Sequence, residues 1–245
     1  MAVHYRTQGF IFRKNDFVEA DRIFTIFTKD FGKLEILGKA IRKIKSKLRG
    51  GMRLFSLANI EFIQGKTYKT LTDASLIEDF PDLRKNLKRL KITYEISEIL
   101  DDLIRGQEKD EKIWNLLRET FQRLNNLSLS VKECWLIYYY FLWNFLSVSG
   151  YRPELNFCSI CQKELIPENL YFNLKEGGVI CFDCFKKTKS GKKIEPDVIK
   201  ILRLILKKEM SLLKRLKIKT AYQEAIKEIS GEYLSFVKGE GYLRR

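Results

Sequence analysis

The sequence of 245 residues contains a single histidine, His4, and this scarcity excludes several kinds of chemistry. A serine or cysteine nucleophile that needs a histidine base would have only this residue, close to the N-terminus, and a metal site of two or three histidines is impossible. Nucleotide-binding glycine loops are also missing, because Ser190-Gly191-Lys192 has Lys186 where a P-loop needs its first glycine. We therefore expect a protein that is not an enzyme and has no catalytic residue.

The sequence has little that suggests export, membrane insertion or disorder. The N-terminus has no apolar core of a signal peptide, and the longest apolar stretch, 134–145, is short and contains Asn144. Glycine and proline, at 14 and 4 residues, are too few for extensive disorder. We expect a cytoplasmic protein without a membrane partner.

Positive charge is abundant and concentrated in two blocks. The net charge is +15, of which residues 33–53 carry +7 and residues 185–219 carry +10, so the rest of the chain is slightly acidic. This clustering favours a surface that binds a polyanion such as a nucleic acid. The alternative is a lysine-rich solvated surface, although such surfaces mix lysine with glutamate. A membrane surface is less favoured, because neither block lies on an identifiable apolar helix face.

Short segments rich in β-branched and aromatic residues fill the N-terminal third, separated by polar turns. They predict strands at 8–13, 22–28, 33–38, 57–63 and 68–73. Five short strands with a basic insertion between the third and fourth predict an OB-fold β-barrel in residues 1–78, although other five-stranded barrels fit the pattern.

Helical periodicity begins after Pro81. Ser130 and Glu133 form a capping-box pattern, and Gly150 followed by Pro153 is typical of a helix end. The helix between them is apolar nearly all round, which predicts the centre of a bundle. We expect helices at 82–105, 111–125, 130–150, 196–215 and 220–238.

Four of the five cysteines form two Cys-x-x-Cys pairs separated by 19 residues. The spacing predicts one structural Zn²⁺ in a closed four-sulfur shell, which leaves no position for a substrate. The segment 170–181 predicts a hairpin that brings the two pairs together. Two disulfides or four buried thiols are the alternatives, and the fifth cysteine, Cys134, is expected to be a buried small hydrophobe. The predicted zinc ligands are Cys158, Cys161, Cys181 and Cys184.

Together these patterns predict an α+β multidomain protein. We expect a nucleic-acid-binding OB-fold domain at 1–78, a helical domain at 79–155 plus 189–245, and a zinc-finger module inserted at 156–188.

The first basic block has irregularly spaced cations separated by apolar residues, so several should project together and neutralise phosphates regardless of sequence. The candidate residues for binding a nucleic acid, which is DNA if the resemblance described next holds, are Lys39, Arg42, Lys43, Lys45, Lys47 and Arg49. The second block could supply another contact patch. Phenylalanines of the neighbouring strands could stack on bases, but for each of them a place in the barrel core is the favoured interpretation. They are Phe10, Phe12, Phe24, Phe27 and Phe31.

Three features resemble the bacterial recombination mediator family RecO. They are the basic segment Gly38–Gly50 followed by Ser56-Leu57, the signature Leu146-Ser-Val-Ser-Gly-Tyr-Arg-Pro-Glu-Leu155, and the cysteine quartet directly behind it. The resemblance implies an OB-fold, a helical domain and a zinc finger. It implies binding of single- and double-stranded DNA, annealing of complementary strands, and loading of RecA with RecR. It also implies contact with the acidic C-terminal tail of single-stranded DNA-binding protein, in the bacterial cytoplasm at the nucleoid.

Two other functions fit parts of the sequence. An enzyme fragment with an OB-fold and a zinc module, such as a ligase or nuclease, is disfavoured by the single histidine and by the missing nucleotide-binding lysine motif. An RNA- or ribosome-binding zinc-ribbon protein would share the basic surface and the four cysteines.

Overall fold

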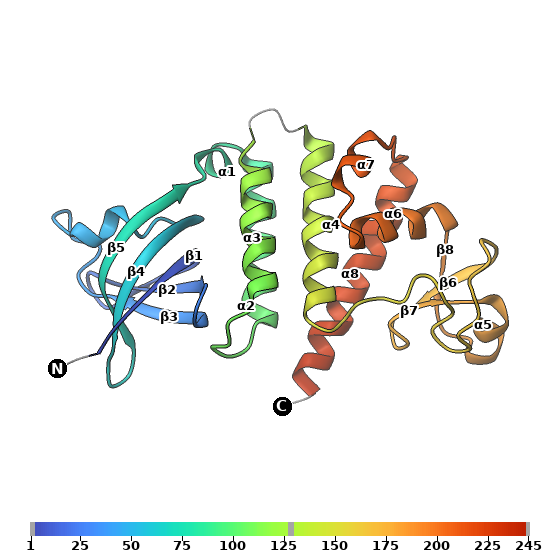
Figure 1. The fold of residues 1–245 in the computed structure, drawn as a ribbon, viewed down its shortest axis with the longest axis horizontal. Coiled ribbons are helices and arrows are strands. Elements are labelled where there is room, and N and C mark those ends of the chain that lie inside the picture. Colours follow the sequence, from blue (N-terminus) through green and yellow to red (C-terminus); the bar gives the residue numbers. More distant parts are fainter. Residues whose placement is uncertain (1–2, 127–129, 244–245) are drawn as a thin grey trace. The chain divides into compact units, whose positions relative to one another are not determined.

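The computed structural model describes residues 3–126 and 130–243. Contacts group Met1–Cys134 into one compact unit and Trp135–Arg245 into a second, and Figure 1 labels the elements of both. These two units are a grouping by contacts. The three domains expected from the sequence, at 1–78, 79–155 plus 189–245, and 156–188, stay a prediction about separately folding parts.

The five N-terminal strands confirm the predicted OB-like fold. The strand order β1-β2-β3-β5-β4 closes into a barrel, because β4 also pairs with β1. β3 and β5 pair in parallel, and the other four pairs are antiparallel. The strands are β1 (His4–Phe17), β2 (Asp21–Thr28), β3 (Gly32–Gly38), β4 (Ser56–Gln64) and β5 (Lys69–Asp79).

β1 is longer than the sequence pattern indicated because it takes part in two strand pairs. Its first half pairs with β4 from His4 to Ile11, and its second half pairs with β2 from Gly9 to Phe17. A register irregularity between Ile11 and Arg13 bends the strand where the two pairings meet. The aromatic residues expected in the core are there: four are at most 1% exposed, and the fifth packs against the core with part of its surface exposed. The four are Phe10, Phe12, Phe24 and Phe27, and the fifth is Phe31.

Three helices complete the first unit: α1 (Pro81–Lys85), α2 (Leu87–Leu103) and α3 (Glu111–Leu124). The expected single helix at 82–105 is therefore wrong at Asn86, which has extended backbone and caps α2 by accepting from the N–H groups of Lys88 and Arg89. An asparagine side chain that bonds to nearby backbone competes with continuation of a helix. The barrel residue Phe10 packs on α3, with its ring centroid 4.9 Å from that of Trp114.

The second unit contains most of α4, a small three-stranded sheet and four further helices. The capping box is confirmed, because the Ser130 N–H donates to Glu133 and the Glu133 N–H donates back to Ser130 Oγ. The expected helix at 196–215 is wrong near its middle, where Lys208 has a left-handed backbone (φ 60°) that ends one helix before the next begins. The elements are α4 (Val131–Val148), β6 (Leu170–Asn173), β7 (Gly178–Ile180), α5 (Phe182–Thr188), β8 (Lys192–Ile194), α6 (Pro196–Leu206), α7 (Met210–Arg215) and α8 (Thr220–Leu243).

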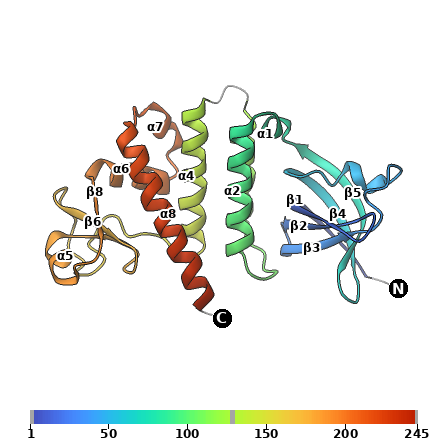
Figure 2. The same ribbon diagram turned by 180° about the vertical axis from the view of Figure 1, so that it is seen from behind.

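Trp143 of α4 is the centre of the core of the second unit. Its indole N–H donates to Ser230 of α8 at 2.9 Å, and its ring stacks on Tyr233 with centroids 5.5 Å apart. The next residue, Asn144, donates to the carbonyl of Ile205 in α6 at 2.9 Å. A buried indole and amide are stable here because each has a partner. Figure 2 shows α4, α6 and α8 from the reverse side, with the small sheet beyond them.

Gly150 ends α4 as expected. It has a left-handed backbone (φ +91°), and the N–H of Tyr151 returns to the carbonyl of Leu146 at 2.8 Å while the Gly150 N–H returns to Ser147. This is the Schellman pattern that satisfies the last carbonyls of a helix. Among the described residues, no helix is both long and apolar enough to cross a membrane.

Replacing Gly150 should destabilise the protein through its backbone conformation alone, because no atom lies within 4 Å of an added Cβ. We expect Gly150→Ala to lower the free energy of unfolding by about 1 kcal/mol, since an L-residue resists positive φ. Gly150→Asn should lose less, because asparagine tolerates this conformation. Urea unfolding of both variants measures the difference, and equal losses would contradict the capping role.

Candidate metal centre and nucleic-acid interface

The four cysteines of the two Cys-x-x-Cys pairs come together at one point. All four Sγ atoms lie within 4.8 Å of one another, and those of Cys161 and Cys181 are 3.8 Å apart. Cys158 and Cys184 are buried, Cys181 is half-buried and Cys161 is exposed. A set of four thiols at this separation could bind a metal ion.

The β6–β7 hairpin brings the two cysteine pairs together, as the sequence predicted. Gly177 turns the hairpin with a left-handed backbone (φ 62°), and β7 leads directly into Cys181. The first pair is held on the same strand, because the N–H of Ser159 donates to Val179 at 2.9 Å. β8 adds a third strand beside β6, which the sequence did not reveal.

The thiols of this cluster differ in acidity. Burial alone would raise the pKa of Cys158, but backbone N–H groups of Cys161, Cys181 and Ile160 outweigh burial and lower the pKa to about 6. Burial first, and then hydrogen bonds with the other three thiols, raise the pKa of Cys184 to about 12. Without a cation the cluster therefore resists full deprotonation, because four thiolates this close repel one another.

None of the five cysteines forms a disulfide, which argues against the alternative of two cross-links. Cys134 is 4% exposed in α4, and burial raises the pKa of its thiol. This confirms the expectation of a buried small hydrophobe.

The six cations expected to bind DNA lie in the loop between β3 and β4, which includes one short 3₁₀ turn, η1 (Lys47–Gly50). All six side chains are exposed. Within the described part of the chain, five of them form no ion pair: Lys39, Lys43, Lys45, Lys47 and Arg49. Their positive charges are therefore not cancelled by neighbouring acids.

The loop is anchored at both ends and is not a free tether. Ile41 and Met52 are at most 5% exposed in the barrel core, and the N–H of Ala40 donates to Asp21 at 2.7 Å. Arg42 differs from the other cations because it donates to the carbonyl of Glu19 at 2.9 Å and lies 3.5 Å from Asp16. It therefore holds the loop to the β1–β2 turn, and its contact with DNA stays a prediction.

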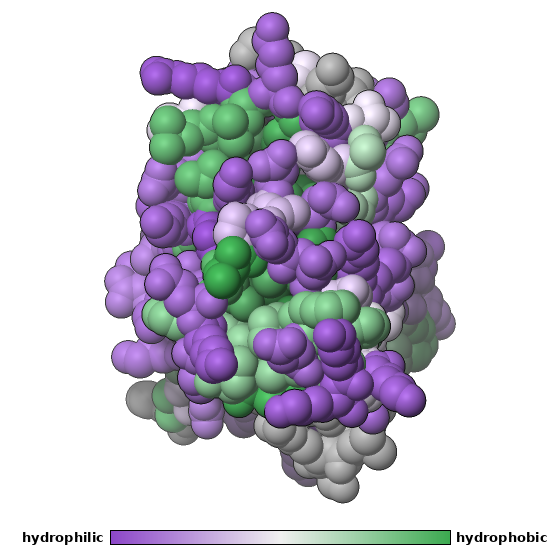
Figure 3. Space-filling model, turned by 90° about the vertical axis from the view of Figure 1, so that its right-hand side faces the viewer, coloured by the Kyte–Doolittle hydropathy of each residue, from purple (hydrophilic) through white to green (hydrophobic). Residues whose placement is uncertain are grey.

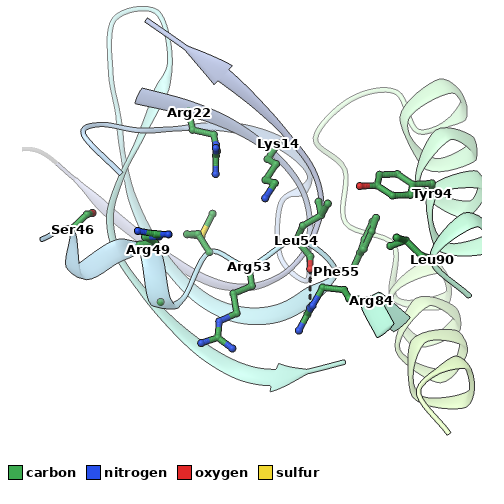
Figure 4. Close-up of a pocket in the computed structure, with 12 residues that line it drawn as sticks. Lys14, Arg22, Ser46, Arg49, Arg53, Leu54, Phe55, Arg84, Leu90 and Tyr94 are labelled. Atoms are coloured by element: carbon green, nitrogen blue, oxygen red, sulfur yellow. Dashed lines mark hydrogen bonds between the residues drawn. The ribbon is translucent and has the colours of Figure 1, made fainter. Parts of the chain in front are cut away.

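A pocket of about 780 Å³ lies beside this loop (Figure 4). Sequence reasoning had found only one of its cations as a candidate site residue, Arg49. The others come from β1, β2, the end of the loop and α1, and only strand pairing brings them together. No local motif could have indicated this set. The five cations are Lys14, Arg22, Arg49, Arg53 and Arg84, and the apolar lining includes Leu54, Phe55, Leu90 and Tyr94.

Two carboxylates compensate part of this charge: Asp16, which binds Arg22 at 2.6 Å, and Asp79. Asp79 binds Arg53 at 2.9 Å and also binds Arg84. Burial alone would raise the pKa of Asp79, but hydrogen bonds from these guanidinium groups keep it below its ordinary value. Burial first, and then the charge of Arg22, lower the pKa of Lys14.

The cations of the second basic block, residues 185–219, do not all have the same surroundings, because several bind acidic groups or a carbonyl of the second unit. Lys192 binds Glu228 and Glu232 of α8, Lys200 binds Asp197, and Arg203 donates to the carbonyl of Leu155 at 3.0 Å. These three cations stabilise the second unit. The other lysines and arginines of the block are exposed. The face of the second unit in Figure 3 shows hydrophilic side chains interspersed with apolar ones.

Comparison with known proteins gives consistent matches over the chain. The family profile described as Recombination protein O N terminal matches residues 1–80, and that described as Recombination protein O C terminal matches residues 84–244. A DNA repair protein RecO of Dehalococcoides mccartyi is 32% identical over 214 residues, 87% of this chain and 83% of the relative. A DNA repair protein RecO of Caldanaerobacter subterraneus is 30% identical over 230 residues, 94% of this chain and 91% of the relative.

Gly178 is required where the first cysteine pair approaches β7. A Cβ on this residue would lie 2.4 Å from the carbonyl oxygen of Glu154, and backbone cannot yield as a flexible side chain can. We expect Gly178→Ala to lower the free energy of unfolding by about 1–3 kcal/mol. The matched control is Gly231→Ala in α8, which meets no atom within 4 Å and should leave stability unchanged or higher. Equal destabilisation of both variants in urea would contradict the close approach.

Proposed function

Because the chain belongs to the RecO family of DNA repair proteins, we propose that it is a non-enzymatic recombination mediator. It binds single- and double-stranded DNA, anneals complementary strands, and helps to load RecA together with RecR. The observation that carries this proposal is the exposed loop at 39–49, where five cations without ion-pair partners in the described part of the chain project from an OB-like barrel.

The loop is suited to binding phosphates regardless of base sequence. Each cation that neutralises a phosphate releases condensed counterions, and this release supplies affinity without reading bases. Annealing has the same electrostatic basis, because two polyanionic strands approach more readily when a protein supplies positive charge to both. Lysines in an irregular loop can serve strands of any sequence.

The proposal requires no covalent step. His4, the single histidine, lies 2.6 Å from the carboxylate of Glu61 on the neighbouring strand β4 and contacts no hydroxyl or thiol in the described part of the chain.

The proposed partners follow from the family and from charge. The acidic C-terminal tail of single-stranded DNA-binding protein is complementary to a chain of net charge +15, and RecR and RecA act on the same DNA. The proposal assigns no particular residue to these protein contacts.

Removing loop cations should weaken DNA binding and annealing in proportion to the phosphates they contact. For Lys43→Gln/Lys45→Gln/Lys47→Gln we expect the slope of log affinity against log salt to fall by about 2–3, since each phosphate contact contributes about 0.7–0.9. Fluorescence anisotropy with labelled oligonucleotides across a salt series measures the slope. Annealing of complementary strands coated with single-stranded DNA-binding protein should slow in parallel.

The matched control removes the same charge elsewhere in the first unit. Lys66, Lys88 and Lys112 are exposed and lie outside the loop, and replacing all three by glutamine should change the slope little. Equal effects of the two triple variants would overturn the role of the loop. A strong preference for RNA over single-stranded DNA of the same sequence would favour the RNA-binding alternative.

We also propose that Cys158, Cys161, Cys181 and Cys184 bind one structural Zn²⁺. A tetrahedral site with Zn–S bonds of about 2.3 Å has sulfur–sulfur separations of about 3.8 Å, and the Sγ atoms of Cys161 and Cys181 are 3.8 Å apart. The ion would neutralise the thiolates that otherwise repel one another. With four protein ligands it would have no open position, so its role is to stabilise the fold.

The purified chain should contain one zinc per molecule, and Cys158→Ser should lose it. Chelation should lower the melting temperature and remove several kcal/mol of stability, because metal binding and folding of the site are linked. Cys134→Ala is the matched control and should keep the full zinc content. Unchanged melting after verified removal of the metal would contradict the structural role.

A further inference from the structure

The pocket beside the basic loop combines two chemically different sides. Figure 4 shows Lys14, Arg22 and Arg49 on the barrel side and Leu90 and Tyr94 on the side of α2. Its volume of about 780 Å³ falls in the range of roughly 300–1,000 Å³ of small-ligand pockets. A ligand that fills it must therefore carry both a negative charge and an apolar, flat part.

The charged side has spare positive charge. Asp79 compensates Arg53 and Arg84, and Asp16 binds Arg22 at 2.6 Å. Lys14 and Arg49 form no ion pair with any residue in the described ranges 3–126 and 130–243. A phosphate between them would gain charge-assisted hydrogen bonds that the protein does not already make.

The apolar side presents an aromatic ring in a fixed position. Tyr94 is 46% exposed, and the buried ring of Phe55 packs against it at a centroid distance of 4.9 Å with an interplanar angle of 82°. This edge-to-face contact orients the tyrosine. Leu90, one helical turn earlier on α2, widens the apolar side.

The pocket continues into neighbouring hollows, so a polymer could pass through it. One hollow of about 200 Å³ shares Arg22, Arg49 and Met52 with the pocket and extends it toward Arg42 of the loop. A second of about 320 Å³ shares Lys14, Leu54 and Tyr94. Arg42 and Arg49 of the loop, the pocket and Tyr94 therefore form one track on the first unit.

We infer that the pocket holds one unpaired nucleotide of a DNA strand, with its phosphate between Lys14 and Arg49 and its base against Tyr94 and Leu90. The inference rests on the proposed DNA binding. A base inside a duplex is stacked on both faces and paired along one edge, so it cannot reach the ring, whereas the base of a single strand can. The loop thus binds phosphates of either form, and the pocket adds affinity only for unpaired DNA.

The test compares two oligonucleotides of equal length without terminal phosphates, one of thymidines and one of abasic sites. Their backbone charge is the same. The full-length wild-type chain should bind the thymidine strand at least about fivefold more tightly, the lower end of what one stacked base contributes. Tyr94→Leu should remove most of this preference while its affinity for the abasic strand is unchanged, and Tyr94→Phe should retain it. Lys14→Gln should weaken binding of both strands equally.

Each contrary outcome has a distinct meaning. If wild type binds both strands but Tyr94→Leu keeps the preference, the pocket inference is overturned and the proposed DNA binding stands. If wild type binds neither strand, the proposed function fails and the inference fails with it. If Tyr94→Leu does not fold, photo-crosslinking of wild type to a single strand that contains 5-iodouracil shows whether a base lies against Tyr94. We expect the crosslink in the peptide that contains Tyr94, and crosslinks confined to other peptides would overturn the inference.

Discussion

The double pairing of β1 is the constraint on which the first unit depends. One strand bonds to β4 with its first half and to β2 with its second, and this closes the barrel. Closure also fixes where the charged side chains meet. Lys14 lies on the second half of β1 opposite Phe24, and Arg22 lies on β2 opposite Gly38, where the basic loop departs. The cations of the loop and of the two strands thus share one end of the barrel.

Local sequence signals predicted the elements well, because each depends on a few neighbouring residues. The Ser130–Glu133 box, the Gly150 helix end and the cysteine hairpin are all contacts within a short segment. Two helix interruptions were missed at Asn86 and Lys208, since periodicity continues through them and only the backbone conformation changes. The pocket could not be predicted, because its cations are brought together by strand register and by α1. A pairing shift of one residue would move those side chains to the other face.

The cysteine cluster is a second case in which like charges are brought close together. Backbone N–H groups lower the pKa of Cys158, yet burial and its neighbours raise that of Cys184, so the thiols cannot all ionise alone. Gly178 makes this approach possible by letting Glu154 pass against β7 without a side chain between them. A bound cation would attract all four thiolates and so offset their mutual repulsion. It would thereby link the two cysteine pairs at the end of β7.

The proposed loop and pocket contacts differ in what they detect, and this difference would let the paired product leave the protein more readily than the single strand. The proposed phosphate contacts of the loop would respond to charge, which pairing does not remove, whereas the proposed contact with Tyr94 needs a free base. When a complementary strand pairs with the bound one, the base would leave the tyrosine ring and its contribution to binding would be lost. The free energy of base pairing would offset this loss. Under this proposal the duplex would be held by the loop alone and would lose the contribution of the base contact, especially as salt rises. Base pairing itself would supply the driving force for annealing, and a protein of this design would release the paired product without a catalytic step, because it would bind the duplex by one contact fewer than the single strand.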